Sequence, residues 1–86
     1  SASGEQLVKA LDALDAGNVS AGDKQLAPLA QGDTASAVAA KLLRAGIALE
    51  QGRDAEAAKL FGEVAADDGA PQPYRDLASV REIAAK

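Results

Sequence analysis

Serine hydroxyls are the side chains of this 86-residue chain with the clearest chemical potential, because an activated serine can act as a nucleophile. The chain has five serines, at positions 1, 3, 20, 36 and 79. Activation requires a general base, most often histidine, and the chain contains neither histidine nor cysteine. All the serines except Ser79 lie near the start of a stretch with helical spacing, where a hydroxyl accepts hydrogen bonds from free backbone amides. The other four serines are therefore predicted to cap helices.

Carboxylates offer a second kind of chemistry, since a close pair can transfer protons or hold a calcium ion. Asp67 and Asp68 are the one adjacent acidic pair in the sequence. They stand directly before Gly69, in a turn-forming stretch where aspartate side chains bond to nearby backbone amides. We therefore predict no catalytic, cofactor-binding or metal-binding residue, no cofactor and no enzymatic activity.

Charge and hydropathy narrow the range of partners. The net charge is −4, and the nine lysines and arginines are scattered along the chain. We therefore expect no nucleic-acid binding and no direct membrane contact. No apolar run is long enough to cross a bilayer. Because the chain starts with Ser1 and contains no methionine, we expect a processed form or an excised fragment, from which an upstream signal or anchor could have been lost.

The elements that carry these residues repeat with a period of 35 residues. Residues 1–35 placed on residues 36–70 give eleven identities, more than an alanine-rich composition gives by chance. The identical pairs are Ser1/Ser36, Ala2/Ala37, Leu7/Leu42, Ala10/Ala45, Ala13/Ala48, Leu14/Leu49, Gly17/Gly52, Lys24/Lys59, Ala30/Ala65, Asp33/Asp68 and Ala35/Ala70. A period in the mid-thirties with helical patterning is typical of stacked helix pairs.

The spacing of apolar residues predicts five helices. They are expected over residues 4–16, 20–30, 36–51 and 55–66, and from about residue 73 onward. Ser3, Ser20 and Asp54 are the predicted N-terminal caps. Gly17 and Gly52 are predicted to end the first and third helices.

The helices are predicted to form a single all-α domain that spans residues 1–86. Its parts are repeat one (1–35), repeat two (36–70) and a partial repeat or capping helix (71–86). The predicted architecture is a right-handed stack of about two and a half helix-turn-helix repeats. The apolar residues of the third helix cover two stripes, so this helix should be buried on two sides.

The spacing of small and large residues around the two turn glycines resembles that of a tetratricopeptide repeat. In the second unit the matching residues are Ala45, Gly52, Ala57, Phe61 and Val64. In the first unit they are Ala10, Gly17, Gly22, Leu26 and Leu29. Small residues let paired helices approach closely, and large residues fill the adjoining gap. Lys41 and Arg44 depart from the family pattern, because they stand where apolar residues are common.

The C-terminal run over residues 73–81 follows an alanine-rich repeat that contains Gln51, Gly52 and Arg53. Together they resemble the membrane-anchored periplasmic tetratricopeptide-like proteins of Gram-negative bacteria, which include ancillary subunits of the Sec translocon. In that family a membrane helix precedes the repeats, and the repeats dock translocon and periplasmic chaperone partners. The resemblance implies a non-catalytic interaction module, itself a soluble fragment, on the periplasmic side of the inner membrane.

In a tetratricopeptide array the first helix of each pair lines the concave side, which predicts a partner-binding surface there. The predicted residues are Leu7, Leu11, Leu14, Leu42, Gly46, Leu49, Tyr74, Leu77 and Arg81. Most of them are apolar and fit a groove for a partner helix or an extended peptide. Asp15, Glu50 and Arg81 would form its polar rim. The alternative is that these residues are ordinary core between adjacent pairs, and the sequence leaves both interpretations open.

Structural self-association is the alternative function. Leu77, Val80 and Ile83 form an apolar stripe on the fifth helix, which has no second helix to cover it. We expect this stripe to be partly exposed, and we hypothesise a homodimer through it. A groove left open in a monomer favours partner binding, whereas a groove closed by a second copy favours self-assembly.

Overall fold

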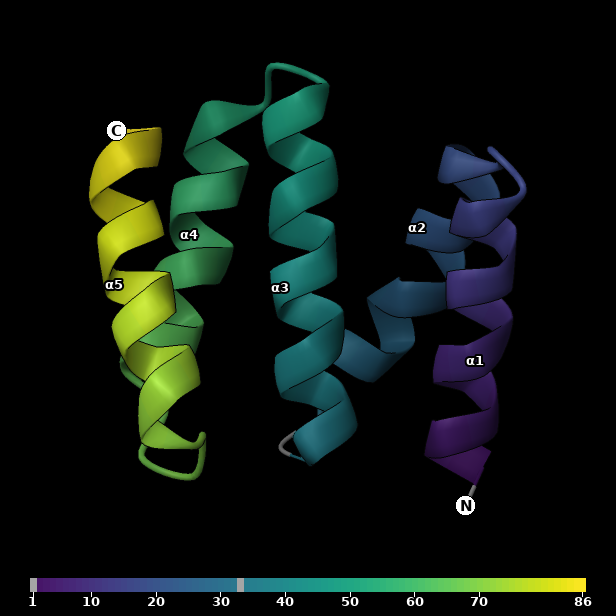
Figure 1. Ribbon diagram of the computed structural model, residues 1–86, viewed down its shortest axis with the longest axis horizontal. Helices are drawn as coiled ribbons and strands as arrows, with labels where there is room; N and C mark the ends of the chain where they lie inside the picture. Colours follow the sequence, from purple (N-terminus) through teal and green to yellow (C-terminus); the bar gives the residue numbers. More distant parts are fainter. Residues whose placement is uncertain (1, 33) are drawn as a thin grey trace.

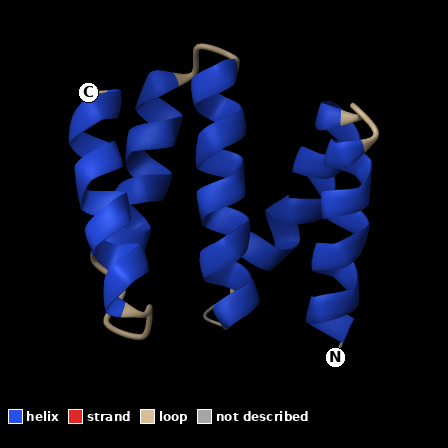
Figure 2. Cartoon of the chain, viewed as in Figure 1, coloured by secondary structure: helices blue, strands red, loops and turns tan. Residues whose placement is uncertain are grey.

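The computed structural model describes residues 2–32 and 34–86, and within them all regular structure is helical (Figure 2). The helices are α1 (Ala2–Asp15), α2 (Val19–Ala30), α3 (Ala35–Glu50), α4 (Asp54–Ala65) and α5 (Gln72–Ala85). The predicted all-α class with five helices is confirmed, and each predicted boundary lies within two residues of the observed one. Ser1 and Asp33, which take part in the repeat identities, lie outside the described residues.

Each helix packs against the next helix along the chain, and α1 also touches α3. Figure 1 shows α1 and α5 at opposite ends of the row and α3 in the middle. In the same view α1, α3 and α5 lie nearer the reader than α2 and α4. Side chains of α3 belong to two separate buried clusters, one on each side of it. The prediction that the third helix is buried on two sides is therefore confirmed.

Gly17 and Gly52 occupy equivalent corners. Their φ angles are 87° and 77°, in the left-handed region that favours glycine. In each corner the glycine N–H donates to the carbonyl three residues earlier, and the following N–H donates to the carbonyl five residues earlier. These N···O distances are 3.0 and 2.8 Å in the first corner and 3.1 and 2.7 Å in the second. Both corners are Schellman motifs, so the sequence repeat is also a repeat of backbone geometry.

Replacing Gly17 or Gly52 with alanine is expected to lower the free energy of unfolding by about 1–2 kcal/mol, because a Cβ is strained at positive φ. No atom lies within 4 Å of a Cβ built at either position, so the loss is conformational and should be equal at the two sites. Replacement with asparagine should cost less, since asparagine tolerates this conformation. Urea unfolding followed by circular dichroism measures the losses, and clearly unequal values would contradict the equivalence of the corners.

The core consists of the two clusters that meet on α3. One joins α3, α4 and α5 and contains Phe61 and Val64. The other joins α1, α2 and α3 and contains Leu26. These three are the largest fully buried side chains in the described part of the chain. Leu26 and Phe61 are 35 residues apart, so the same position of each unit fills the centre of its cluster.

Small residues set the close approach of the paired helices. Ala10 and Ala45, which correspond in the repeat, are both fully buried. Gly22 is also buried, and a Cβ built there would lie 2.6 Å from Leu14 Cδ2 and 3.3 Å from the Ala10 carbonyl oxygen. Glycine lowers helix propensity. Its presence in α2 is explained by the closeness of α1, which leaves no room for a side chain.

The structure corrects the predicted helix caps. Ser3 and Ser20 lie inside α1 and α2, and Asp54 is the first residue of α4. Each glycine corner leaves a single residue before the next helix, and that residue makes no side-chain cap hydrogen bond. The helices after the corners therefore begin too early for the predicted caps. Thr34 does cap α3, because its hydroxyl accepts from the Ala37 amide at 3.3 Å.

Helix α5 turns small residues inward and large residues outward. Ala78 and Ala85 are buried in the cluster shared with α3 and α4. Leu77, Val80 and Ile83 are 42%, 67% and 75% exposed. The predicted exposure of this stripe is therefore confirmed.

Candidate functional site

An apolar pocket of about 400 Å³ lies between α3 and the start of α5. Its lining residues are Ala35, Val38, Ala39, Leu42, Leu43, Pro71 and Tyr74. The one polar side-chain group among them is the phenol of Tyr74, a residue that is 48% exposed. Because the lining carries no charge, the pocket suits an apolar side chain of a ligand.

The apolar surface continues from α3 towards α1 through two more open hollows. The first, of about 350 Å³, is lined by Leu14, Val19, Leu42, Leu43, Gly46, Ile47 and Glu50. The second, of about 430 Å³, is lined by Leu11, Asp12, Leu14, Asp15 and Leu43. We call the surface formed by the pocket and the two hollows the inner-helix face. It is apolar at its centre, with carboxylates at the edge near the C-terminal ends of α1 and α3.

Leu43 is the central residue of the inner-helix face, because it lines the pocket and both hollows. Ala39, Leu43, Gly46 and Glu50 are spaced by four, three and four residues, so they share one face of α3. A Cβ built at Gly46 would have no atom within 4 Å. Because Gly46 has no side chain and no neighbour fills its place, the surface beside Leu43 is open there.

The structure brings five of the nine predicted partner-binding residues into this surface. They are Leu11, Leu14, Leu42, Gly46 and Tyr74. Leu7 and Leu49 do not line this surface and are partly buried against the core clusters, as the alternative interpretation expects; Leu14 and Leu42 pack against the clusters as well. Leu77 and Arg81 are exposed on α5 but line neither the pocket nor the two hollows. The predicted rim residues Asp15 and Glu50 do lie at the edge of the hollows.

Sequence reasoning missed five of the residues that line the pocket. They are Ala35, Val38, Ala39, Leu43 and Pro71. The spacing of four residues from Val38 to Leu42 and from Ala39 to Leu43 was the signal that could have found three of them. No comparable signal marks Pro71, because its position depends on the turn between α4 and α5.

Two charged side chains of α3 connect it to its neighbours. Arg44 Nε donates to Asp23 Oδ1 of α2 at 3.0 Å, and Lys41 Nζ lies 3.6 Å from Glu63 Oε1 of α4. The hydrogen bond to Asp23 raises the pKa of the Arg44 guanidinium above its ordinary value, although partial burial opposes the shift. These contacts give a structural reason for charged residues at positions 41 and 44.

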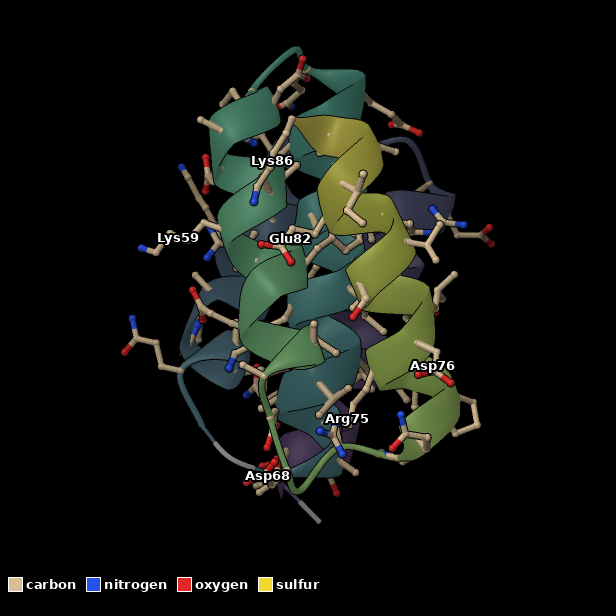
Figure 3. The ribbon with its side chains drawn as sticks, turned by 90° about the vertical axis from the view of Figure 1, so that its left-hand side faces the viewer. Lys59, Asp68, Arg75, Asp76, Glu82 and Lys86 are labelled. Carbon is tan, nitrogen blue, oxygen red and sulfur yellow. The ribbon has the colours of Figure 1, made fainter. Side chains whose placement is uncertain are left out.

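The Asp67–Asp68 pair has local partners. Asp67 Oδ1 accepts from the Gly69 amide at 2.9 Å, and Asp68 Oδ1 lies 3.5 Å from the Arg75 guanidinium (Figure 3). Within residues 2–32 and 34–86 no group of three acidic side chains is arranged to hold a metal ion. In the same part of the chain no helix combines the length and the apolar character that crossing a membrane requires.

Comparison of the chain with protein-family models, curated proteins and solved structures gave no match. The class of the protein is therefore defined by its geometry: a small all-helical domain that presents an apolar inner-helix face.

Proposed function

We propose that this chain is a non-catalytic protein–protein interaction module that binds a segment of another protein on its inner-helix face. The observation that carries the proposal is the solvent-open, apolar pocket between α3 and α5. Apolar surface of this kind is stabilised by contact with the apolar side chains of a partner. The ligand it suits is a helix or an extended peptide with one large apolar residue that enters the pocket.

The proposed arrangement of the helices is a tetratricopeptide-like stack. It is supported by the matching corners at Gly17 and Gly52 and by the matching burial of Leu26 and Phe61. In such a stack the first helix of each unit lines the binding side. Apart from Val19 of α2 and Pro71 before α5, the residues of the inner-helix face lie on those helices, α1, α3 and α5.

The proposed setting is the periplasmic side of the inner membrane, on a membrane-tethered protein that docks secretion or chaperone partners. The support for this setting is the resemblance of residues 73–81 and of the repeat before them. An apolar membrane span upstream of Ser1 in the full-length protein would agree with the tether. A full-length protein without such a span would contradict it.

Peptide binding can be read directly at the pocket, because Tyr74 is the only tyrosine and the chain has no tryptophan. Peptides selected by display on the domain, and free of both aromatic residues, should change the Tyr74 fluorescence when they bind. Ala39→Lys places a charge in the pocket lining and should weaken binding at least about tenfold, since burying an unpaired charge is unfavourable. The matched control is Ala21→Lys, at an exposed alanine of α2 that lies outside the inner-helix face.

The control variant should bind with unchanged affinity. Equal losses in the two lysine variants would place the binding surface elsewhere. Selected peptides that bind without any change in Tyr74 fluorescence would also contradict the proposal.

A further inference from the structure

The outer side of α5 carries apolar surface that the pocket does not use. Val80 and Ile83 are its most exposed residues, and Leu77 lies beside them. The buried side of the same helix consists of small residues, Ala78 and Ala85. The larger apolar side chains of α5 thus face solvent.

The equivalent positions in the two repeats are covered. Val80 follows Ala45 by 35 residues and Ala10 by 70, and both alanines are fully buried. Ala10 lies next to Gly22 of its own helix pair, and Ala45 shares a cluster with Ala57 of its own pair. Within the described residues no helix covers Val80. In a stacked array this is a surface on which another helix packs.

The charged residues beside this surface are placed so that they can pair with those of a second copy. Pro73, Leu77, Val80 and Ala84 follow the spacing of a two-stranded coiled-coil seam, four, three and four residues apart. Asp76 and Arg81, five residues apart, then take the flanking g and e positions. In a parallel pair of helices a g residue faces the e residue five positions later on the partner. Asp76 of each copy would therefore lie beside Arg81 of the other.

Both charges are available for such contacts. Figure 3 shows Asp76 on the side of α5 that faces away from α4. Asp76 accepts one hydrogen bond, from Gln72 Nε2 at 2.8 Å. Among the described residues neither Asp76 nor Arg81 takes part in an ion pair. In an antiparallel pair the g positions of one copy lie beside the g positions of the other, and the e positions beside the e positions. Asp76 and Arg81 would then not face each other.

We propose that α5 pairs in parallel with α5 of a second copy, through Leu77 and Val80 at the seam and two Asp76–Arg81 ion pairs at its edges. This pairing goes beyond the proposed peptide binding, because it uses the outer side of α5. One helix pair buries less surface than the roughly 800 Å² per partner of a standard interface, so the dimer is weak and depends on concentration. Exposed ion pairs are screened by salt, so it also weakens as salt is raised.

Disulfide trapping tests the parallel arrangement, because the chain has no cysteine of its own. In a parallel pair Val80 faces Val80 of the second copy, so Val80→Cys should form a covalent dimer under mild oxidation. The matched control is Ser79→Cys, an exposed neighbour that points away from the seam, and it should stay monomeric at the same concentration. Equal cross-linking of the two variants, or cross-linking of neither, would overturn the proposal.

Charge exchange tests the ion pairs independently. Asp76→Arg and Arg81→Asp should each raise the dissociation constant of the dimer at least about tenfold, because two attractive pairs become repulsive. An equimolar mixture of the two variants should dimerise again, since each copy then faces the opposite charge. Sedimentation equilibrium measures all three samples, and circular dichroism checks that each variant is folded.

Three results would overturn the pairing. The first is a native chain that stays monomeric at millimolar concentration. The second is an open series of larger assemblies, which indicates head-to-tail stacking of α5 on the exposed Val8 and Leu11 of α1. The third is a mixture of the charge variants that dimerises no better than either variant alone. The disulfide result does not depend on the folding of the charge variants.

Discussion

Phe61→Ala is expected to lower the free energy of unfolding by about 3–5 kcal/mol. Phe61 is 2% exposed and is the largest fully buried side chain of the described core. Most of the buried residues in its cluster are alanines, whose short side chains cannot move in to fill the space that the ring leaves. Small domains are stable by about 5–15 kcal/mol. The variant should therefore lose a large part of the stability of the domain, as urea denaturation followed by circular dichroism would measure.

Two controls accompany this variant. Leu26→Ala removes the corresponding side chain of the first unit and should also be strongly destabilising, by about 2–5 kcal/mol. Tyr74→Ala removes the other aromatic ring, which is half exposed, and should cost much less. A loss at Phe61 no greater than the loss at Tyr74 would contradict the burial of Phe61 in the cluster shared by α3, α4 and α5.

Gly22→Val is expected to lower the free energy of unfolding by about 1–3 kcal/mol, because it overpacks the contact between α1 and α2. A Cβ at this position meets Leu14 Cδ2 at 2.6 Å and Leu14 Cγ at 2.7 Å. Either the leucine must leave its place or the two helices must separate. Helix propensity alone would make the valine variant more stable, because it favours valine over glycine. The expected loss of stability has the opposite sign. Stability measurements therefore separate the packing effect from the propensity effect.

Gly46→Val is the matched control for this substitution. Gly46 also lies inside a helix, but a Cβ there has no atom within 4 Å. The control should leave the stability unchanged within about 0.5 kcal/mol or raise it slightly. A Gly22 variant as stable as the Gly46 variant would show that α1 and α2 do not meet as closely as described.

The helices could be predicted from the sequence because their signals are local. Apolar spacing and the turn glycines at positions 17 and 52 depend on residues within one helical turn. The prediction that Ser20 and Asp54 cap helices is wrong because the next helix begins a single residue after each Schellman corner. That geometry depends on the glycine φ angle and on hydrogen bonds back into the preceding helix. The presence of a polar residue after the corner does not show where the next helix begins.

The candidate site could be predicted only in part, because it depends on how each helix is rotated in the stack. Leu42 and Leu49 are both apolar positions of α3, and a seven-residue spacing places them on one face. Both pack against the core cluster that contains Phe61, but only Leu42 also lines the pocket. Leu43 lies in the centre of the surface because α1 approaches that side of α3, and this contact cannot be read from α3 alone.

The most direct measurement of the central claim is a nuclear magnetic resonance titration of the isotope-labelled domain with a display-selected peptide. Binding on the inner-helix face predicts that the largest amide shifts fall in residues 38–43 and 71–74, which line the pocket between α3 and α5. The amides around the exposed Lys59 of α4 should not move. Shifts centred on α4, or on α2 alone, would contradict the claim that this pocket is where the protein binds its partner.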